Sequence, residues 1–280
     1  MKFAQIYYQN RLFVTDVVDD GLIPFNYERD TISLMQEDTF PDKMENLVIP
    51  IDSAEFLPPI LRPSKIIAIG LNYLDHAAEG KVEIPDTPLV FTKFSNSLVG
   101  HKQSIGWNQT ITKQVDYEAE LAVIIGKLAY NCSKEEANDV IWGYTCANDV
   151  SARDLQFGDG QWVRGKSLDT FCPLGPWIVL KEDIESPLSL NIQCRVNGQI
   201  MQQSNTEKMI FSVPELVSFL SKHFTLFPGD VILTGTPDGV GAFREPPLYL
   251  KHGDQIDVEI ESIGCLSNLA LVESENNGDV

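Results

Sequence analysis

The sequence predicts a β-dominated fold, a sandwich- or barrel-like body with few helices. Three observations support this class. Most apolar segments are short and rich in β-branched residues, which is typical of strands. The dipeptide Asn197-Gly198 between two such segments is a strong signal for a two-residue hairpin. Helical spacing of apolar residues is found in few places, most clearly at Val213–Phe224.

The first sixty residues predict a small β-rich unit. Phe3–Tyr8 and Arg11–Val17 are expected to pair as a hairpin. A cluster of prolines between positions 58 and 63 then gives the clearest break in the chain. We therefore predict a small N-terminal domain over residues 1–62 and a main domain over residues 63–280.

The main domain is expected to open with a buried strand at Lys65–Gly70. Further strands are predicted at Leu89–Lys93, Val115–Ile125, Ile141–Asn148, Trp177–Leu180, Leu188–Val196, Gln199–Gln203, Val231–Thr234, Gln255–Ile260 and Leu266–Val272. A second helix is expected at Ser133–Asp139, because Ser133 and Glu136 have capping-box spacing. Residues 151–167 contain several glycines and predict an ordered loop without regular structure, and the polar tail 273–280 is expected to fray.

Charge excludes some classes of partner. The chain of 280 residues has 21 Lys and Arg against 40 Asp and Glu, a formal net charge of −19. Such an excess argues against nucleic acid and anionic membranes as partners. An anionic substrate would therefore need a local cationic site within an acidic surface.

Cysteine usage points to a reducing compartment. There are five cysteines, an odd number, and no C-x-x-C motif, which favours buried free thiols. The first residues have no apolar signal-peptide core, and no apolar run approaches the length of a membrane span. We expect a cytoplasmic protein.

Three acidic side chains are the most informative feature of the chain. Glu118 and Glu120 lie two positions apart in a predicted strand, so both should project from the same face. Alone, such a pair is more often a solvated strand face. Here the flanks are apolar, and Asp149 also follows an apolar strand. Carboxylates brought together near a core favour a hard divalent cation with oxygen ligands.

Two further segments carry candidate chemistry. His76 and Glu79 are three residues apart, so one helical turn would place a carboxylate beside an imidazole, as a general base requires. The alternative is a surface turn with a capping histidine. Arg153 and Lys166 lie close in sequence to the acids, and Lys166 could stabilise developing negative charge. Their alternative is ordinary salt bridging, for example between Arg153 and Asp154.

A glycine- and threonine-rich segment at 233–241 follows a predicted strand. Its amides and hydroxyls could face an anion, but it lacks G-K-[ST] and is not a Walker loop. A structural turn is the simpler interpretation of this segment alone.

Five segments in this order resemble motifs of the fumarylacetoacetate hydrolase family. They are N-Y-L-D-H, D-Y-E-A-E-L, N-D-V-S-A-R-D, W-V-R-G-K-S-L-D-T-F-C-P-L-G-P and L-T-G-T-P-D-G-V-G. The resemblance runs from about Lys65 to the last strand. The additional N-terminal unit is similar to the bacterial branch whose members are described variously as hydrolases, isomerases and decarboxylases. The resemblance implies a mixed β-roll or sandwich core of the family type, a homodimer, and Mg²⁺ or Mn²⁺ as cofactor.

The resemblance also implies roles for individual residues. Glu118, Glu120 and Asp149 match the metal ligands of the family, His76 and Glu79 match its water-activating dyad, and Lys166 matches its active-site lysine. Positions that line the substrate pocket in relatives correspond to Lys93, Arg153, Gln156 and Thr236. One departure is Leu71, where some acylpyruvate-cleaving relatives have arginine.

The implied substrate is a small anionic 2-oxo acid with a β-carbonyl or β-carboxylate. The first expectation is hydrolysis of a C–C bond in an acylpyruvate or fumarylpyruvate through an enolate. The alternatives are oxaloacetate decarboxylation, tautomerisation, and 2-hydroxyhepta-2,4-diene-1,7-dioate isomerisation. A catalytically silent binding protein on the same fold is a candidate from a different class, although all the matched site residues are present.

Overall fold

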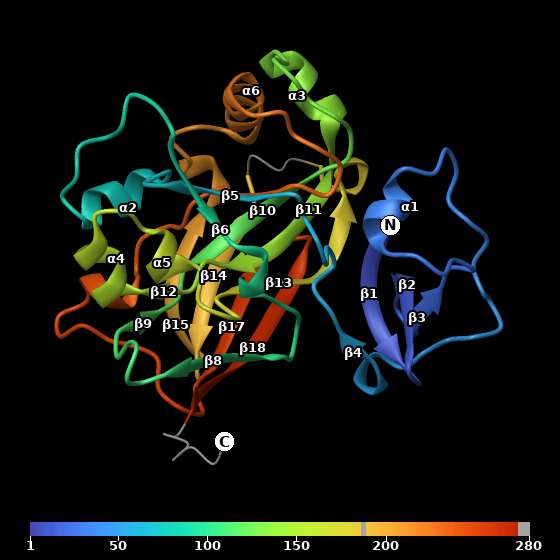
Figure 1. Cartoon of the computed structure of the whole chain (residues 1–280), viewed down its shortest axis with the longest axis horizontal. Coiled ribbons are helices and arrows are strands. Elements are labelled where there is room, and N and C mark those ends of the chain that lie inside the picture. The colour runs from blue at the N-terminus through green and yellow to red at the C-terminus, as the bar shows by residue number, and fades with distance from the viewer. Residues whose placement is uncertain (186–188, 274–280) are drawn as a thin grey trace, which may run out of the picture.

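A large mixed sheet runs through the molecule and carries most of the chain's apolar segments. The computed structural model describes residues 1–185 and 189–273. In the order in which they lie side by side (Figure 1), the strands of this sheet are β3 (Gly21–Pro24), β2 (Arg11–Val18), β1 (Lys2–Tyr8), β13 (Cys172–Leu180), β11 (Ile141–Asn148), β10 (Ala119–Ile125), β16 (Val231–Leu233), β5 (Ile66–Gly70) and β6 (Leu89–Lys93). Most neighbours are antiparallel, whereas β16 runs parallel to β5. Two short strands, β4 (Glu55–Phe56) and β7 (Leu98–Val99), pair with β1 and β13.

A second sheet packs against the first. It contains β15 (Gln199–Asn205), β14 (Asn191–Val196), β17 (Gln255–Ile260), β18 (Gly264–Glu273) and β8 (Ser104–Asn108). Side chains of both sheets form one buried apolar cluster, which includes Val123 and Tyr144 from the first and Ile192, Val258 and Leu266 from the second. This packing of two apolar faces is a sandwich, as the alternating burial of β14 and β17 requires.

Helices cover the ends of the sheets (Figure 1). They are α1 (Thr31–Met35), α2 (Leu74–Glu79), α3 (Lys134–Val140), α4 (Arg153–Asp159), α5 (Val163–Lys166) and α6 (Val213–His223). Single 3-10 turns lie at η1 (Ile51–Ser53), η2 (Ser95–Ser97), η3 (Lys181–Asp183), η4 (Thr206–Lys208) and η5 (Gly241–Phe243). α3 and α6 lie together, joined by a 2.6 Å ion pair between Lys134 and Glu215. Both have the capping box, predicted for α3 from Ser133 and Glu136.

The β-dominated fold and its tight hairpins are confirmed. Asn197 and Gly198 have φ angles of 51° and 79° between β14 and β15. Two positive φ values in succession define the type I′ turn that the sequence predicts. The hairpin between β1 and β2 turns in the same way at Gln9 and Asn10.

Two local predictions were wrong. Residues 151–167 are largely helical rather than a loop, because their glycines serve helix ends and helix contacts. Gly160 ends α4 in a left-handed conformation with φ 69°. A Cβ on Gly165 would lie 2.7 Å from the amide nitrogen of Gln156, so glycine lets α5 pack directly on α4.

The strand predicted at Val115–Ile125 is interrupted. β9 (Val115–Asp116) pairs with β12 (Ser151–Ala152), whereas β10 pairs with β11, and the two intervening residues belong to neither strand. At this break, side-chain oxygens accept the hydrogen bonds of two backbone amides that a continuous strand would pair with a neighbouring strand. The amide of Tyr117 donates to Asp116 Oδ1, and the amide of Glu118 donates to Asn148 Oδ1.

The N-terminal strands join the large sheet. Phe3 of β1 lies opposite Ile178 of β13, so β1, β2 and β3 extend the sheet of the main body. The predicted division at residue 62 stays an interpretation of the proline cluster. Residues 274–280 of the predicted tail, and the first residue of the strand predicted at 188–196, lie outside the described residues; that strand begins at Asn191.

All five cysteines are free thiols, as predicted, and only Cys265 is partly exposed. Within the described ranges, none of the helices combines the length and apolar character that crossing a bilayer requires.

Acid is expected to destabilise the fold partly through His101. Its Nδ1 accepts a hydrogen bond from the amide of Ser267 at 3.0 Å, which requires an unprotonated Nδ1. Burial, and secondarily Lys102, lowers the pKa of His101 to about 4. The unfolded chain, with the ordinary histidine pKa, therefore binds a proton before the folded protein does, and stability falls as pH falls from about 6.5 towards 4.

Allowing for the partial exposure of the ring, we expect His101 to account for about 1 kcal/mol of lost stability between pH 7 and pH 5. Denaturant unfolding of the wild type and His101→Asn at both pH values measures this. The asparagine can still accept from Ser267 but does not titrate. An equal pH dependence in both proteins would contradict the assignment.

Candidate metal and catalytic site

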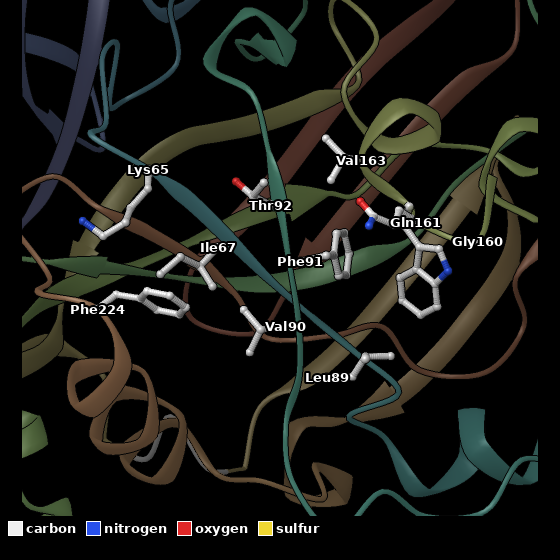
Figure 2. A pocket seen from close by; sticks show the side chains of 11 residues that line it. Lys65, Ile67, Leu89, Val90, Phe91, Thr92, Gly160, Gln161, Val163 and Phe224 are labelled. Atoms are coloured by element: carbon white, nitrogen blue, oxygen red, sulfur yellow. The ribbon is translucent and has the colours of Figure 1, made fainter.

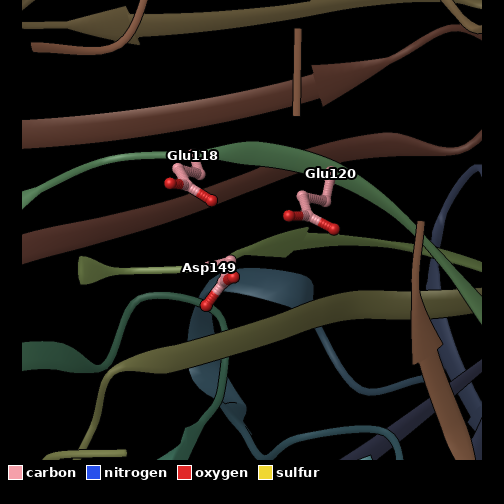
Figure 3. A group of neighbouring side chains, drawn as sticks. All are labelled: Glu118, Glu120 and Asp149. Atoms are coloured by element: carbon pink, nitrogen blue, oxygen red, sulfur yellow. The ribbon is translucent and has the colours of Figure 1, made fainter. Parts of the chain in front are cut away.

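Glu118, Glu120 and Asp149 converge where β10 begins and β11 ends, on two neighbouring inner strands of the large sheet (Figure 3). One carboxylate oxygen from each lies within 4.8 Å of those of the other two, and all three side chains are buried. The prediction that Glu118 and Glu120 project together is confirmed, although Glu118 precedes β10 rather than lying in it. Asp149 is held at the end of β11, where its amide donates to the carbonyl of Glu118 at 2.9 Å.

Two lysines compensate part of this negative charge. Lys166 Nζ donates to Glu118 Oε2 at 2.8 Å and to Asp149 Oδ2 at 2.7 Å. Lys93 Nζ donates to Asp149 Oδ1 at 2.5 Å and to the carbonyl of Val150 at 3.2 Å. The side chain of Lys93 is completely buried. Its contacts make it a counter-charge to Asp149, and substrate contact stays a prediction for this residue.

Arg153 is the third buried cation. Its guanidinium lies 2.7 Å from Glu118 Oε1 and 2.8 Å from Asp116 Oδ2. It therefore pairs with these carboxylates and not with Asp154, which accepts from Thr112 at 2.6 Å. Asp116 in turn accepts from the amides of Gly241 and Ala242, so Arg153 connects the acidic centre to the loop after β16.

These contacts separate the protonation behaviour of the two glutamates. Burial would raise the pKa of Glu118, but Lys166 and Arg153 outweigh it and lower this pKa to about 2. Glu120 has the opposite environment. Its burial, together with the charges of Asp149 and Glu118, raises its pKa well above the usual range. The amide of Gly235 donates to Glu120 Oε2 at 2.7 Å, but no lysine or arginine in the described part of the chain forms an ion pair with it.

The acidic centre fits a divalent cation. Its four buried carboxyl groups face three buried cations, which leaves one carboxyl without a cationic partner; the groups are Asp116, Glu118, Glu120 and Asp149 against Lys93, Arg153 and Lys166. Three carboxylate oxygens at this spacing are a hard-ion donor set. Glu120, which lacks a cationic partner, is the member that most requires an added cation.

His76 and Glu79 lie on one face of α2, as predicted. His76 Nδ1 is 3.3 Å from Glu79 Oε2, and Glu79 Oε1 accepts from the amide of Gly239 at 3.0 Å. Glu79 is therefore fixed on both oxygens. An anionic carboxylate at Nδ1 favours the tautomer with hydrogen on Nδ1, which leaves Nε2 free to accept a proton.

A small cavity brings the dyad to the acidic centre. It has a volume of about 170 Å³, and His76, Glu118 and Lys166 all line it. Of the predicted substrate positions, Arg153, Gln156 and Thr236 also line this cavity, whereas Lys93 does not. Gln156 Oε1 accepts from Arg153 at 2.8 Å, and Thr236 Oγ1 accepts from Gln202 at 2.8 Å.

Leu71 lines the same cavity with a left-handed φ of 54°. Among the described residues that line it, the cationic side chains are Arg153 and Lys166, and both are paired with carboxylates. The position that carries arginine in some relatives therefore contributes apolar surface here.

Sequence reasoning missed Asp116, Trp162 and Phe243. Asp116 continues the two-residue spacing of Glu118 and Glu120, so the alternation of acids was an available signal. Trp162 and Phe243 are walls of the cavity that tertiary packing alone brings together. The ring of Phe243 lies 5.7 Å from that of His76, measured between centroids.

Comparison with known proteins identifies the family of this chain. The family described as fumarylacetoacetate (FAA) hydrolase C-terminal matches residues 65–270. The mitochondrial oxaloacetate tautomerase of Rattus norvegicus is 48% identical over 222 residues, which cover 79% of this chain and 71% of that protein. An uncharacterised protein of Archaeoglobus fulgidus is 52% identical over 223 residues, covering 80% and 84% of the two chains.

Solved structures with a similar fold include proteins of the same family. A fumarylacetoacetate hydrolase from Exiguobacterium antarcticum superposes with a TM-score of 0.89 at 35% identity, covering 98% of this chain and all of that one. A 2-hydroxyhepta-2,4-diene-1,7-dioate isomerase from Mycobacterium marinum has a TM-score of 0.83 at 33% identity with the same coverage. The chain is thus an enzyme that belongs to the fumarylacetoacetate hydrolase family.

Proposed function

We propose that the protein catalyses keto–enol tautomerisation of oxaloacetate or a closely similar 2-oxo dicarboxylate. The observation that carries this proposal is the cavity of about 170 Å³, whose lining includes His76 of the dyad, Lys166, and Glu118 of the acidic trio. It is smaller than typical pockets for drug-sized ligands, and its size suits a short acid. Relatives named as a tautomerase and as isomerases support proton transfer over C–C hydrolysis.

The acidic trio supports a divalent cation, Mg²⁺ or Mn²⁺, held by Glu118, Glu120 and Asp149. When bound, such a cation supplies Lewis-acid stabilisation of negative charge that develops on a 2-oxo oxygen. It would also make the net charge at the centre positive, which an anionic substrate requires.

The chain's own residues have complementary roles in this reaction. His76 Nε2 takes a proton from the carbon next to the 2-oxo group and returns it in the reverse direction, while the oxygen exchanges its own proton with water. Glu79 keeps the imidazole in the required tautomer through its 3.3 Å contact with Nδ1. Lys166 donates two of its three N–H groups to Glu118 and Asp149, and the third is available to the enolate oxygen.

C–C hydrolysis, the first expectation from the sequence, is the competing candidate, because the same dyad could activate water. Oxaloacetate decarboxylation would share the enolate. A homodimer and a cytoplasmic location stay predictions from the sequence.

A substrate panel separates these reactions. With Mg²⁺ or Mn²⁺ present, we expect loss of the ultraviolet absorbance of enol-oxaloacetate to be faster than pyruvate release from oxaloacetate, acetylpyruvate or fumarylpyruvate. The difference should be about two orders of magnitude or more, the scale of positioned acid–base catalysis. Faster hydrolysis of an acylpyruvate than tautomerisation of oxaloacetate would refute the proposal.

A further inference from the structure

Two adjacent pockets are separated by an aromatic wall. The inner pocket is the catalytic cavity of about 170 Å³, and the outer pocket has a volume of about 580 Å³. Phe91 of β6 and Trp162, which precedes α5, line both. These two side chains are therefore the boundary between a small catalytic cavity and a larger space beside it.

The wall is in contact with the catalytic machinery. The ring centroids of Phe91 and Trp162 lie 5.2 Å apart, with the rings at 72° to each other. Lys166 Nζ lies 5.3 Å from the centroid of Phe91. Phe91 thus touches the active-site lysine, and Trp162 packs on Phe91.

The indole occupies its position because residue 70 has no side chain. A Cβ on Gly70 would lie 2.5 Å from Trp162 Cζ3 and 3.1 Å from Leu89 Cδ2. The backbone of Trp162 is fixed independently of the ring, since its carbonyl accepts from the amide of Lys166 at 3.0 Å. Removing the indole should therefore leave α5 and Lys166 in place.

The outer pocket offers a mainly apolar surface (Figure 2). Ile67, Leu89, Val90, Val163 and Phe224 line it, with Phe224 and Lys65 at one end and Gly160 at the other. Two of the polar groups around it have partners: Lys65 Nζ is 2.5 Å from Asp230 Oδ2, and Thr92 Oγ1 donates to the carbonyl of Ile66. An unbranched hydrocarbon chain matches this lining.

We propose that Trp162 sets the upper size of the substrate by closing the catalytic cavity against the outer pocket. The proposal rests on the proposed function, because it takes the substrate to be a 2-oxo acid whose carboxylate end lies towards Lys166. With the indole present, the acid is confined to a short chain. Without it, an apolar tail extends past Phe91 into the outer pocket.

The test is calorimetric binding of straight-chain 2-oxo monocarboxylates, from pyruvate to 2-oxooctanoate, and of oxaloacetate, each with Mg²⁺. For Trp162→Ala we expect affinity to rise by about fourfold per added methylene beyond four carbons, the value for full burial of a CH₂ group. For the wild type and for Trp162→Phe, which keeps an aromatic wall, affinity should fall over the same range. Equal dependence on chain length in all three proteins overturns the proposal.

A second substitution locates the bound tail. Phe224 is 46% exposed at the far end of the outer pocket and has no part in the catalytic cavity. Phe224→Asp in the Trp162→Ala background should remove the gain for the longest acids and leave oxaloacetate binding unchanged. Phe224→Asp could instead change the solution mass of the protein and leave the higher affinity for the longest acids intact. In that case the outer pocket is a contact between copies of the chain, and the proposal fails.

The same titrations distinguish failure of this inference from failure of the proposed function. If the wild type binds and tautomerises oxaloacetate but Trp162→Ala gains nothing for longer acids, the role of Trp162 alone is refuted. If neither protein binds any 2-oxo acid, both are refuted.

Discussion

Glu120→Gln is expected to abolish binding of the divalent cation and, at the same time, to stabilise the metal-free protein. Glu120 is buried beside two other carboxylates, and no ion pair with a described lysine or arginine compensates it. Glutamine has nearly the same shape without the charge, and its side-chain oxygen can still accept from Gly235. We expect a gain of about 1–2 kcal/mol in the unfolding free energy at neutral pH, because the raised pKa of Glu120 makes folding of the metal-free chain take up a proton at a cost that glutamine does not have.

Glu118→Gln is the matched substitution and should act in the opposite direction on stability. Glu118 is paired with Lys166 and Arg153 at 2.8 and 2.7 Å. Removal of its charge leaves these buried cations under-compensated, and a loss of about 3–5 kcal/mol is expected. Both variants should lose the cation's stabilising effect, which for the wild type is about 2.7 kcal/mol at a hundredfold excess over Kd.

Chemical unfolding with a chelator and with added Mg²⁺ or Mn²⁺ measures both effects. The opposite signs matter, because general damage to the site would destabilise both variants. Cation-induced stabilisation that persists in both would show that the trio is not the metal site.

His76→Ala is expected to reduce tautomerisation of oxaloacetate by about 10²–10⁴-fold, the usual contribution of a positioned acid or base. Metal binding should not change, because the trio lies on other elements of the chain. Glu79→Gln should approach the same loss. Its amide nitrogen can donate to His76 Nδ1, which would put the hydrogen on Nε2, the atom required as the base.

The readouts are kcat, KM and the calorimetric affinity for the cation. His223→Gln is the control, since His223 is exposed on α6 and its Nδ1 is 2.8 Å from the carbonyl oxygen of Phe219. Unchanged kcat in His76→Ala would remove this residue from the mechanism. A loss of cation binding in the same variant would show that its effect is structural.

Sequence alone was sufficient for features that depend on local pattern. The period of two on a strand predicted the convergence of Glu118 and Glu120, and the His76–Glu79 spacing predicted their contact on one helical turn. The type I′ turn at Asn197-Gly198 depends only on two residues that tolerate positive φ.

The features that sequence could not provide depend on neighbours far along the chain. The pairing of Arg153 with Asp116 and Glu118, instead of with Asp154, is decided by the break between β9 and β10. The glycines of residues 151–167 indicated a loop because their packing role exists only once α4 and α5 are in contact. The wall formed by Trp162 depends equally on Gly70, more than ninety positions earlier.

The pairing of β1 with β13 has a consequence for solubility. β13 is a long and mostly buried strand, and β1 occupies its backbone hydrogen-bonding edge at Val179 and Ile178. An apolar strand with a free edge is a template for association with other chains. The N-terminal strands therefore move the edge of the sheet from the nine-residue β13 to the four-residue β3, which is a shorter template for such association.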